Sequence, residues 1–176
     1  ETAVQSGQLE DAVLDRAVER ILRLIFQVDE TLSEDYTYDR QTHHDLARRA
    51  AGEGAVLLQN DAAVLPLQEN ADIALIGHFA YTPRYQGAGS SLMNPTQLDN
   101  LHDELTKLIG AENLVYAPGY TERGDQPDET LIQEAVEAAQ SADVVVICAG
   151  LTDYHEVEGL DREHMKMPPG HDALIQ

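Results

Sequence analysis

Three short, unbroken runs of apolar residues constrain the fold of this chain more than any other feature. They are residues 73–76, 114–117 and 144–148, and amphipathic segments separate them. Runs that lack polar alternation are typical of parallel strands covered by helices on both faces. The order strand, helix, strand, helix, strand therefore predicts an α/β fold with a doubly wound, mostly parallel sheet sandwiched by helices.

Two helices are expected between these strands. Asn94 can cap a helix over residues 95–109, which has Pro95 at its first position and a leucine stripe along one face. A second helix is expected over residues 128–140. Residues 55–58 form another short apolar run of strand type, and residues 171–176 resemble the start of a further helix. We therefore expect a sheet that is only part of a domain, truncated at its C-terminal side.

The N-terminal part follows a different pattern. Apolar residues recur every three or four positions over residues 9–28, which predicts one amphipathic helix with Ser6 as its cap. Residues 29–41 have no sustained apolar face and predict a linker. A short helix is expected from Thr42 to residue 51. The predicted organisation is a helix in residues 1–28, a linker in residues 29–41 and the α/β domain in residues 42–176.

The composition excludes several classes of partner. The 176 residues include 11 Lys and Arg against 32 Asp and Glu, a formal net charge of -21. This charge would repel a nucleic-acid backbone and an anionic membrane alike, so neither is an expected partner. No apolar run reaches the roughly 20 residues of a membrane-spanning helix. Cys148 is the only cysteine, and no export signal is visible, which favours a cytoplasmic protein.

Ligands of open parallel sheets bind beyond the carboxyl ends of the strands, which directs attention to two loops. The first, residues 77–95, reads GHFAYTPRYQGAGSSLMNP and is long for a connection between a strand and a helix. Its glycines let backbone amides approach a ligand, and Arg84, Tyr85 and Gln86 offer side chains suited to hydroxyls or carboxylates. It has neither a dinucleotide fingerprint nor a Walker lysine, so no cofactor is expected. A glycine-rich surface loop without a ligand is the alternative interpretation.

The second loop, residues 151–170, holds the densest group of titratable side chains in the chain. Five carboxylates surround three basic side chains: Asp153, Glu156, Glu158, Asp161 and Glu163 around His155, Arg162 and His164. Crowded, partly desolvated carboxylates have raised pKa values, as a general acid requires near neutral pH. Glu158 is the better candidate because Gly159 beside it removes steric bulk. Asp161 and Arg162 can form a charge pair that fixes the loop.

A metal site is a second interpretation of this loop. Asp153, His155 and Glu158 offer oxygen and imidazole ligands. Their spacing matches no recognised ligand motif, so no metal is expected. A solvated acidic loop in an acidic protein is the third interpretation.

Four segments, in this order, resemble glycoside hydrolase family 3, particularly its bacterial β-glucosidases. They read LDRAVERILRLIFQ, HHDLARRAAGEGAVLLQNDAAVLPL, IALIGHFAYTPRYQGAGSSLMNP and VVVICAGLTDYHEVEGLDREHMKMP, and they cover most of the chain. The resemblance implies an N-terminal (β/α)8 barrel followed by an α/β sandwich. Residues 1–28 would be the last helix of the barrel, residues 29–41 the linker between the domains, and residues 42–176 the sandwich.

The resemblance also assigns residues to roles. Retaining glycosidases need two carboxyl groups about 5 to 5.5 Å apart, and in this family the nucleophile is an aspartate on the barrel, upstream of Glu1. The acid/base of the EG-x-DR-like loop corresponds to Glu158, with Glu156 as the alternative. The RYQGAGS segment resembles the loop that faces the barrel near the sugar. We therefore expect the substrate-binding residues to be Arg84, Gln86, Ser90, Asp161 and Arg162.

The sequence thus supports two hypotheses. In the first, the chain is part of a retaining, exo-acting β-glycosidase that hydrolyses terminal β-linked sugars, and it is inactive without the barrel domain, its expected partner. In the second, it is a noncatalytic α/β module that binds a small ligand or regulates another protein. Apolar surface on residues 9–28 and at the edge of an incomplete sheet also predicts self-association, and so a homo-oligomer is possible.

Overall fold

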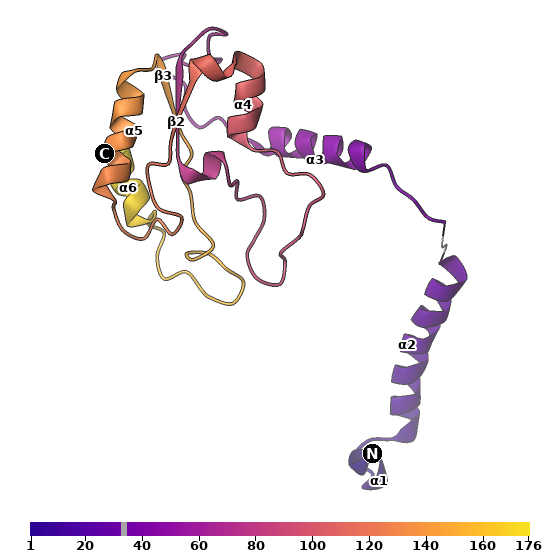
Figure 1. Ribbon diagram of the computed structural model, residues 1–176. Coiled ribbons are helices and arrows are strands. Elements are labelled where there is room, and N and C mark those ends of the chain that lie inside the picture. Colours follow the sequence, from indigo (N-terminus) through magenta and orange to yellow (C-terminus); the bar gives the residue numbers. More distant parts are fainter. Residues whose placement is uncertain (33–34) are drawn as a thin grey trace. The chain divides into compact units, whose positions relative to one another are not determined.

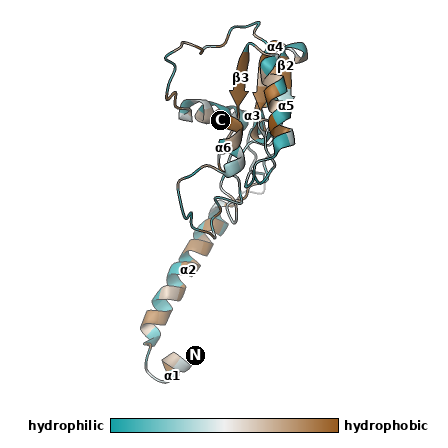
Figure 2. Ribbon diagram, turned by 90° about the vertical axis from the view of Figure 1, so that its left-hand side faces the viewer, coloured by the Kyte–Doolittle hydropathy of each residue, from teal (hydrophilic) through white to brown (hydrophobic). Residues whose placement is uncertain are grey.

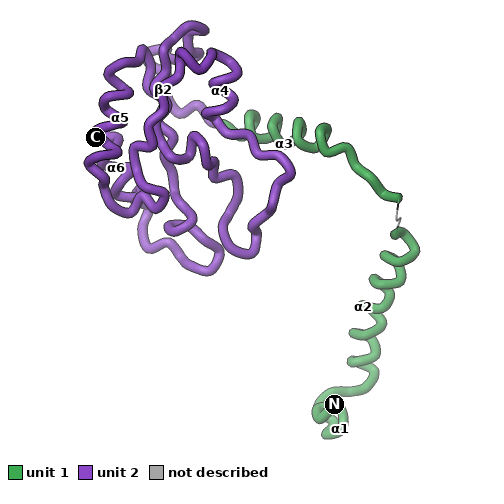
Figure 3. Tube along the Cα trace, viewed as in Figure 1, with its two compact units in different colours: residues 1–55 green, residues 56–176 purple. Residues whose placement is uncertain are grey.

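The computed structural model of the chain describes residues 1–32 and 35–176. These residues divide into two compact units, residues 1–55 and residues 56–176, which Figure 3 distinguishes by colour. Each unit is described by itself.

The first unit is helical. It contains α1 (Thr2–Gln5), α2 (Asp11–Thr31) and α3 (Arg40–Gly54), and none of the residues of these helices is buried. Apolar and polar residues alternate along α2 with the expected helical spacing (Figure 2). Its apolar stripe is exposed, including Ile21, Leu24 and Ile25. None of the described helices combines the length and hydropathy needed to cross a membrane.

The ends of these helices differ from the sequence predictions. Ser6 ends α1 instead of capping the next helix, and α2 follows Glu10 without a side-chain cap. The third helix starts before Thr42 because the carboxylate of Asp39 accepts hydrogen bonds from the backbone N–H groups of Gln41 and Thr42. The expected linker, residues 29–41, is therefore helical at both ends. Its residues 33 and 34 lie outside the described part of the chain.

The second unit contains the predicted parallel sheet. Its strands are β1 (Ile73–Ile76), β2 (Leu114–Ala117) and β3 (Val144–Ile147), in the order β2-β1-β3. Ile73 lies opposite both Leu114 and Val144, so the three strands begin in register. All four residues of the central strand β1 are buried, which explains its unbroken apolar sequence.

Helices cover both faces of this sheet. The chain passes from β1 to β2 through α4 (Leu101–Ile109) and returns past β1 to β3 through α5 (Glu129–Gln140). Crossover connections are almost always right-handed, so two connections in opposite directions place their helices on opposite faces. Figure 1 shows α4 and α5 on the two sides of the sheet. The predicted doubly wound α/β sheet is confirmed.

A small-residue core joins α5 to the sheet. It consists of one isoleucine and several alanines, with a leucine of α6 (Pro169–Ile175) packed against it: Ala74, Ile76, Ala117, Ala135, Ala138 and Leu174. Alanine on both sides lets the helix approach the strands closely. The helix predicted at residues 171–176 is thus present, and it lies on the same face of the sheet as α5.

One predicted helix starts later than expected, and one predicted strand is absent. The helix expected from Pro95 begins only at Leu101, where Asn100 accepts from the N–H of Asp103 at 2.8 Å and donates to its carboxylate at 2.9 Å. This reciprocal cap starts the helix, so the loop after β1 runs to residue 100. Residues 55–58 form no strand among the described residues, because neither edge of the sheet pairs with them, and Leu58 is 91% exposed.

Candidate active site

The two long loops meet at the carboxyl ends of β1 and β3. The loop after β1 leads to α4 on one face of the sheet, whereas the loop after β3 leads to α6 on the other. Adjacent strands whose connections diverge in this way leave a crevice between them, the usual ligand position in open α/β sheets. At its base Gly77 has φ 119°, and a Cβ there would lie 2.2 Å from the carbonyl oxygen of Cys148. Only glycine allows the two loops to leave the sheet this close together.

A buried tyrosine connects the ends of the strands below the crevice. The hydroxyl of Tyr120 donates to the carbonyl of Cys148 at 2.5 Å and accepts from the N–H of Phe79 at 3.2 Å. Burial raises the pKa of Tyr120 to about 12, so the phenol stays neutral and keeps its donor. Tyr120 therefore joins the start of the loop after β1 to the start of the loop after β3.

His171 packs beside this tyrosine. Its ring is fully buried, its centroid lies 3.8 Å from that of Tyr120, and its Nδ1 accepts from the N–H of Gly150 at 3.2 Å. Burial lowers the pKa of His171, which favours the neutral ring that this acceptor requires. Neither Tyr120 nor His171 is among the residues that the sequence predicts for the site. The position of Tyr120 three residues after β2 could have indicated it, whereas nothing in the sequence places His171 under the crevice.

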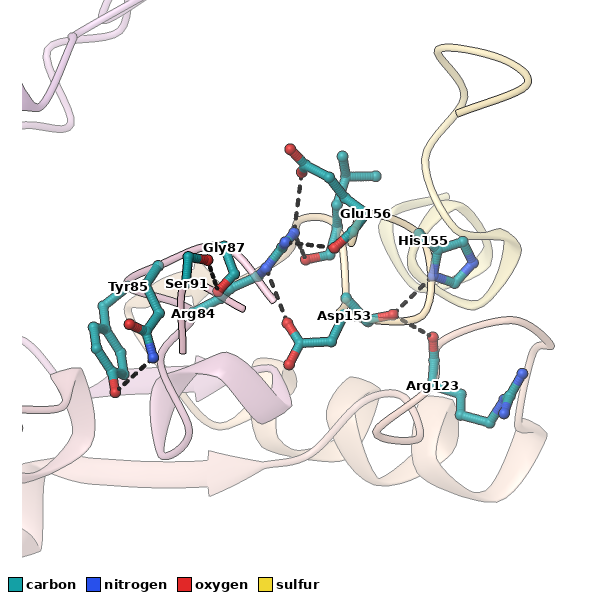
Figure 4. Close-up of polar contacts among 11 residues, drawn as sticks. Arg84, Tyr85, Gly87, Ser91, Arg123, Asp153, His155 and Glu156 are labelled. Atoms are coloured by element: carbon teal, nitrogen blue, oxygen red, sulfur yellow. Dashed lines mark hydrogen bonds and ion pairs between the residues drawn. The ribbon is translucent and has the colours of Figure 1, made fainter. Parts of the chain in front are cut away.

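Arg84 connects the loop after β1 to the loop after β3 (Figure 4). Its Nη1 donates to the carbonyl of Leu151 at 3.0 Å and to the Oε2 of Glu156 at 3.1 Å, and its Nη2 donates to the carbonyl of Glu156 at 2.8 Å. Its Nε lies 3.1 Å from the Oδ1 of Asp153, an ion pair without the alignment of a hydrogen bond. The side chain is 17% exposed. Arg84 is thus bound mainly by the protein itself.

Glu158 lies against the glycine-rich part of the same loop. Its Oε2 accepts hydrogen bonds from the backbone N–H of Ser90, at 3.1 Å, and from the hydroxyl of Ser90. Its backbone N–H donates to the carbonyl of Ala88 at 3.3 Å. Gly89, with φ 96°, lies between these two contacts. The structure therefore brings together Glu158 and Ser90, two of the residues that the sequence places in one site.

Gln86 borders the crevice, and its amide is bound within its own loop. Its Nε2 donates to the carbonyl of Met93 at 3.1 Å and its Oε1 accepts from the N–H of Met93 at 2.8 Å, while the hydroxyl of Tyr85 donates to the same carbonyl at 3.0 Å. Both ends of the amide therefore close the loop on itself. Gln86 shapes residues 86–93, which include Ser90.

The remaining candidates lie on the surface of the loop after β3. Asp161 and Arg162 are exposed, and no ion pair between them occurs in the described part of the chain. The carboxylates of this loop differ in their partners, because Asp153 and Glu156 bind Arg84 whereas Glu158 binds Ser90.

The metal interpretation finds no support in this geometry. The Nδ1 of His155 is 2.8 Å from the hydroxyl of Thr152, while Asp153 binds Arg84 and Glu158 binds Ser90, so each of the three side chains has a protein partner. Within residues 1–32 and 35–176, no group of three His, Cys, Asp or Glu side chains could hold a metal ion.

Arg84 borders two cavities of the crevice. One, of about 270 Å³, is lined by aromatic and acidic side chains, including Phe79, Tyr85, Tyr154 and Glu122. The other, of about 460 Å³, lies along the first residues of the loop after β3, from Cys148 to Leu151. Both are small, and Glu158 borders neither of them. Glu158 is instead exposed at the outer edge of the crevice.

Comparison with known proteins gives a consistent result. Residues 55–176 match the Glycosyl hydrolase family 3 C-terminal domain. The chain is 51% identical over 175 residues to thermostable beta-glucosidase B of Acetivibrio thermocellus, and 39% identical over 185 residues to an exo-alpha-(1->6)-L-arabinopyranosidase of Bifidobacterium longum. It also resembles the crystal structure of the GH3 beta-glucosidase of Bifidobacterium adolescentis, with a TM-score of 0.87 and 38% identity.

These matches cover almost all of this chain and a small part of each relative. Each of the three alignments includes 99% of the chain. The same alignments include 23% of the Acetivibrio protein, 24% of the Bifidobacterium longum protein and 25% of the Bifidobacterium adolescentis chain. The chain therefore spans about a quarter of the length of these relatives.

Proposed function

The chain belongs to glycoside hydrolase family 3, and we propose that it forms part of a retaining, exo-acting β-glycosidase to which it supplies the general acid/base. One observation carries this proposal. Glu158 lies at the carboxyl edge of the sheet, exposed to solvent, and its carboxylate is bound by the hydroxyl and N–H of Ser90. A carboxyl group held by a second polar group and open on one side suits proton transfer to a sugar oxygen.

Glu158 fits the acid/base role better than Glu156. Both the carboxylate and the carbonyl of Glu156 are bound by Arg84, although the side chain of Glu156 is 55% exposed. Glu158 is held through Ser90 and Ala88. The carboxylate of Glu158 is thus bound by a neutral hydroxyl and N–H, whereas a sugar would have to compete with Arg84 for the carboxylate of Glu156.

The mechanism we propose is a double displacement. Glu158 protonates the glycosidic oxygen as the leaving group departs, and an aspartate on the barrel domain of the full-length enzyme forms the glycosyl intermediate. Glu158 then removes a proton from the water that hydrolyses this intermediate. Residues 1–28 are the last helix of that barrel in this proposal, and Ser90, Asp161 and Arg162 contact the substrate.

The substrate we propose is a terminal β-linked glucoside. The beta-glucosidase of Acetivibrio thermocellus has the higher identity of the two named relatives, at 51%. The name of the Bifidobacterium longum relative specifies an α-linked arabinopyranoside. Since the two names specify different sugars and linkages, we infer that the choice of sugar depends on the barrel as well as on this chain.

The test is chemical rescue in the full-length enzyme that carries this chain. With a dinitrophenyl β-glucoside, whose leaving group needs little protonation, Glu158→Ala should slow mainly the hydrolysis of the glycosyl intermediate. Added azide should then restore turnover and yield a β-glucosyl azide. With an alkyl β-glucoside, kcat/KM of the same variant should fall by about 10²- to 10⁴-fold.

Glu156→Ala is the matched control, because it removes a carboxylate from the same loop. It should show no rescue by azide. If Glu156→Ala is rescued and Glu158→Ala is not, the acid/base is Glu156. If neither variant is rescued, the loop is not catalytic and the noncatalytic module becomes the better interpretation.

A further inference from the structure

We propose that Arg84 is a positioning residue for the acid/base. It fixes the backbone of the loop that carries Glu158 relative to the loop after β1, and it does not itself bind the sugar. This inference rests on the proposed function of Glu158. It changes the role of Arg84 from the one that the sequence indicates.

The guanidinium of Arg84 already has protein partners on all three of its nitrogens. Arginine has five N–H donors. Its terminal nitrogens make three hydrogen bonds, to Leu151 and Glu156, while the Nε lies 3.1 Å from Asp153. With 17% of the side chain exposed, little of the group is open to a ligand. The guanidinium therefore serves to hold the protein together at this point, because a sugar hydroxyl could bind it only by displacing one of these partners.

Arg84 binds backbone atoms as well as side chains. Two of its acceptors are backbone carbonyls, those of Leu151 and Glu156. They lie at the two ends of the short segment that leads from the end of β3 toward Glu158. Binding both carbonyls with one planar group therefore sets the path of the backbone, and not merely the position of a side chain.

Glu158 itself also contacts the loop after β1, which carries Arg84. Two residues beyond Glu156, the backbone of Glu158 binds Ala88 and its side chain binds Ser90. The loop after β1 thus holds the loop after β3 at two points, at Arg84 and at residues 88–90. If the first point is released, the backbone before Glu158 is free to shift while the second point stays. Since proton transfer requires a carboxyl group within hydrogen-bond reach of the leaving oxygen, a shift of about 1 Å is enough to reduce the rate.

The experiment is a double-mutant cycle in the full-length enzyme, with Arg84→Met, Glu158→Ala and the double variant. The substrates are an alkyl β-glucoside and a dinitrophenyl β-glucoside. For the alkyl glucoside, we expect Arg84→Met to lower kcat/KM by about 10- to 100-fold. For the dinitrophenyl glucoside, its kcat/KM should change little. The double variant should be no slower than Glu158→Ala, because Arg84 acts through Glu158.

Three further measurements separate positioning from other roles. The inhibition constant of a sugar-shaped competitive inhibitor should be unchanged in Arg84→Met. Arg84→Lys should recover only part of the activity, since an ammonium group cannot match the planar fork that binds both carbonyls. Arg123→Met removes the same charge from an exposed arginine of the neighbouring loop, which pairs with Asp125, and should show no dependence on the leaving group.

The opposite results would overturn the inference. Losses that multiply in the double variant, or a weaker inhibitor together with equal losses on both substrates, would make Arg84 a sugar-binding residue. If Arg84→Met does not fold, the same cycle with Arg84→Lys decides the question. If Glu158→Ala shows neither leaving-group dependence nor azide rescue, the proposed function fails along with the inference. If Glu158→Ala shows both and Arg84→Met behaves like Arg123→Met, only the inference fails.

Discussion

Gly89 and Glu158 are packed so closely that a Cβ on Gly89 would lie 3.2 Å from the Cβ of Glu158 and 3.5 Å from its Oε2. The residues are far apart in the sequence, and they belong to the loops that leave two different strands. The absence of a side chain at Gly89 therefore allows the carboxylate to reach the N–H of Ser90.

Gly89→Ala should consequently impair acid catalysis as well as reduce stability. The new methyl group pushes against Glu158, and the φ of 96° is unfavourable for alanine by about 1 to 3 kcal/mol. We expect a loss of kcat/KM on an alkyl β-glucoside that is larger than the loss on an activated aryl β-glucoside. Gly159→Ala is the control, because a Cβ at Gly159 would meet nothing within 4 Å. Equal effects of the two variants would show that the contact between Gly89 and Glu158 is unimportant.

Ser90→Ala should reduce activity without changing the fold. It removes the hydroxyl that donates to Glu158 and leaves the backbone N–H in place. A hydrogen bond to a charged group contributes about 1.5 to 3 kcal/mol, so kcat/KM should fall by about 10-fold or more. Ser91→Ala serves as the comparison, because the hydroxyl of Ser91 donates to Gly87 within the loop. Steady-state kinetics of both variants would contradict the prediction if Ser91→Ala were the slower enzyme.

Tyr120→Phe should loosen the ends of the strands. The substitution leaves the carbonyl of Cys148 and the N–H of Phe79 without their partner, which costs about 1 to 3 kcal/mol for buried groups. Hydrogen exchange of the peptides that contain residues 77–80 and 148–151 should become faster. Tyr154→Phe removes a hydroxyl from an exposed ring and should leave this exchange unchanged. Unchanged exchange in both variants would contradict the role given to Tyr120.

The stability of the α/β unit should depend on pH through His171. Burial holds the pKa of His171 below its ordinary value of 6.5 in the folded protein, and the positive charge of a protonated His155 acts in the same direction. At low pH the unfolded chain then binds a proton that the folded chain does not. The stabilising contribution is therefore complete above pH 6.5 and is lost as the pH falls toward the lowered pKa of the folded state.

Urea unfolding at about pH 7.5 and about pH 5.5, on either side of the ordinary histidine pKa, measures this dependence. The midpoint of the wild-type protein should be lower at the acidic pH, and in His171→Asn the difference between the two pH values should be smaller. Asparagine retains an acceptor for the N–H of Gly150 but does not titrate. His102→Asn provides the control at a histidine on α4 that pairs with Asp103. A wild-type midpoint that does not fall between these pH values would contradict the prediction.

The parts of the fold that depend on local sequence were predicted well. The strands at residues 73–76 and 114–117 match the structure, and the third ends one residue earlier than expected. The helix over residues 128–140 also agrees, because Asp128 caps it. A buried parallel strand requires an unbroken apolar run, so its position can be recognised in the sequence.

The wrong predictions concern choices between equivalent local signals. Asn94 and Asn100 are both suitable caps, but Met93 is held in the loop by the amide of Gln86, and only Asn100 forms a reciprocal pair with Asp103. The apolar run at residues 55–58 resembles a strand, yet a strand forms only where it pairs with another one, and neither edge of the sheet pairs with these residues. Neither condition is visible in the residues themselves.

The sequence by itself determined the class of the fold, the family and the two loops in which a site could form, because periodicity, capping and motif order are local properties. Only the tertiary structure decided which partner each charged side chain of these loops binds. Arg84 binds Asp153 and Glu156, and Ser90 binds Glu158. These contacts join residues that are distant in the sequence, and they depend on two parallel strands ending side by side. Spacing along the chain does not show which residues of the two loops meet. The carboxylates of the second loop therefore acquire different partners only when the sheet forms.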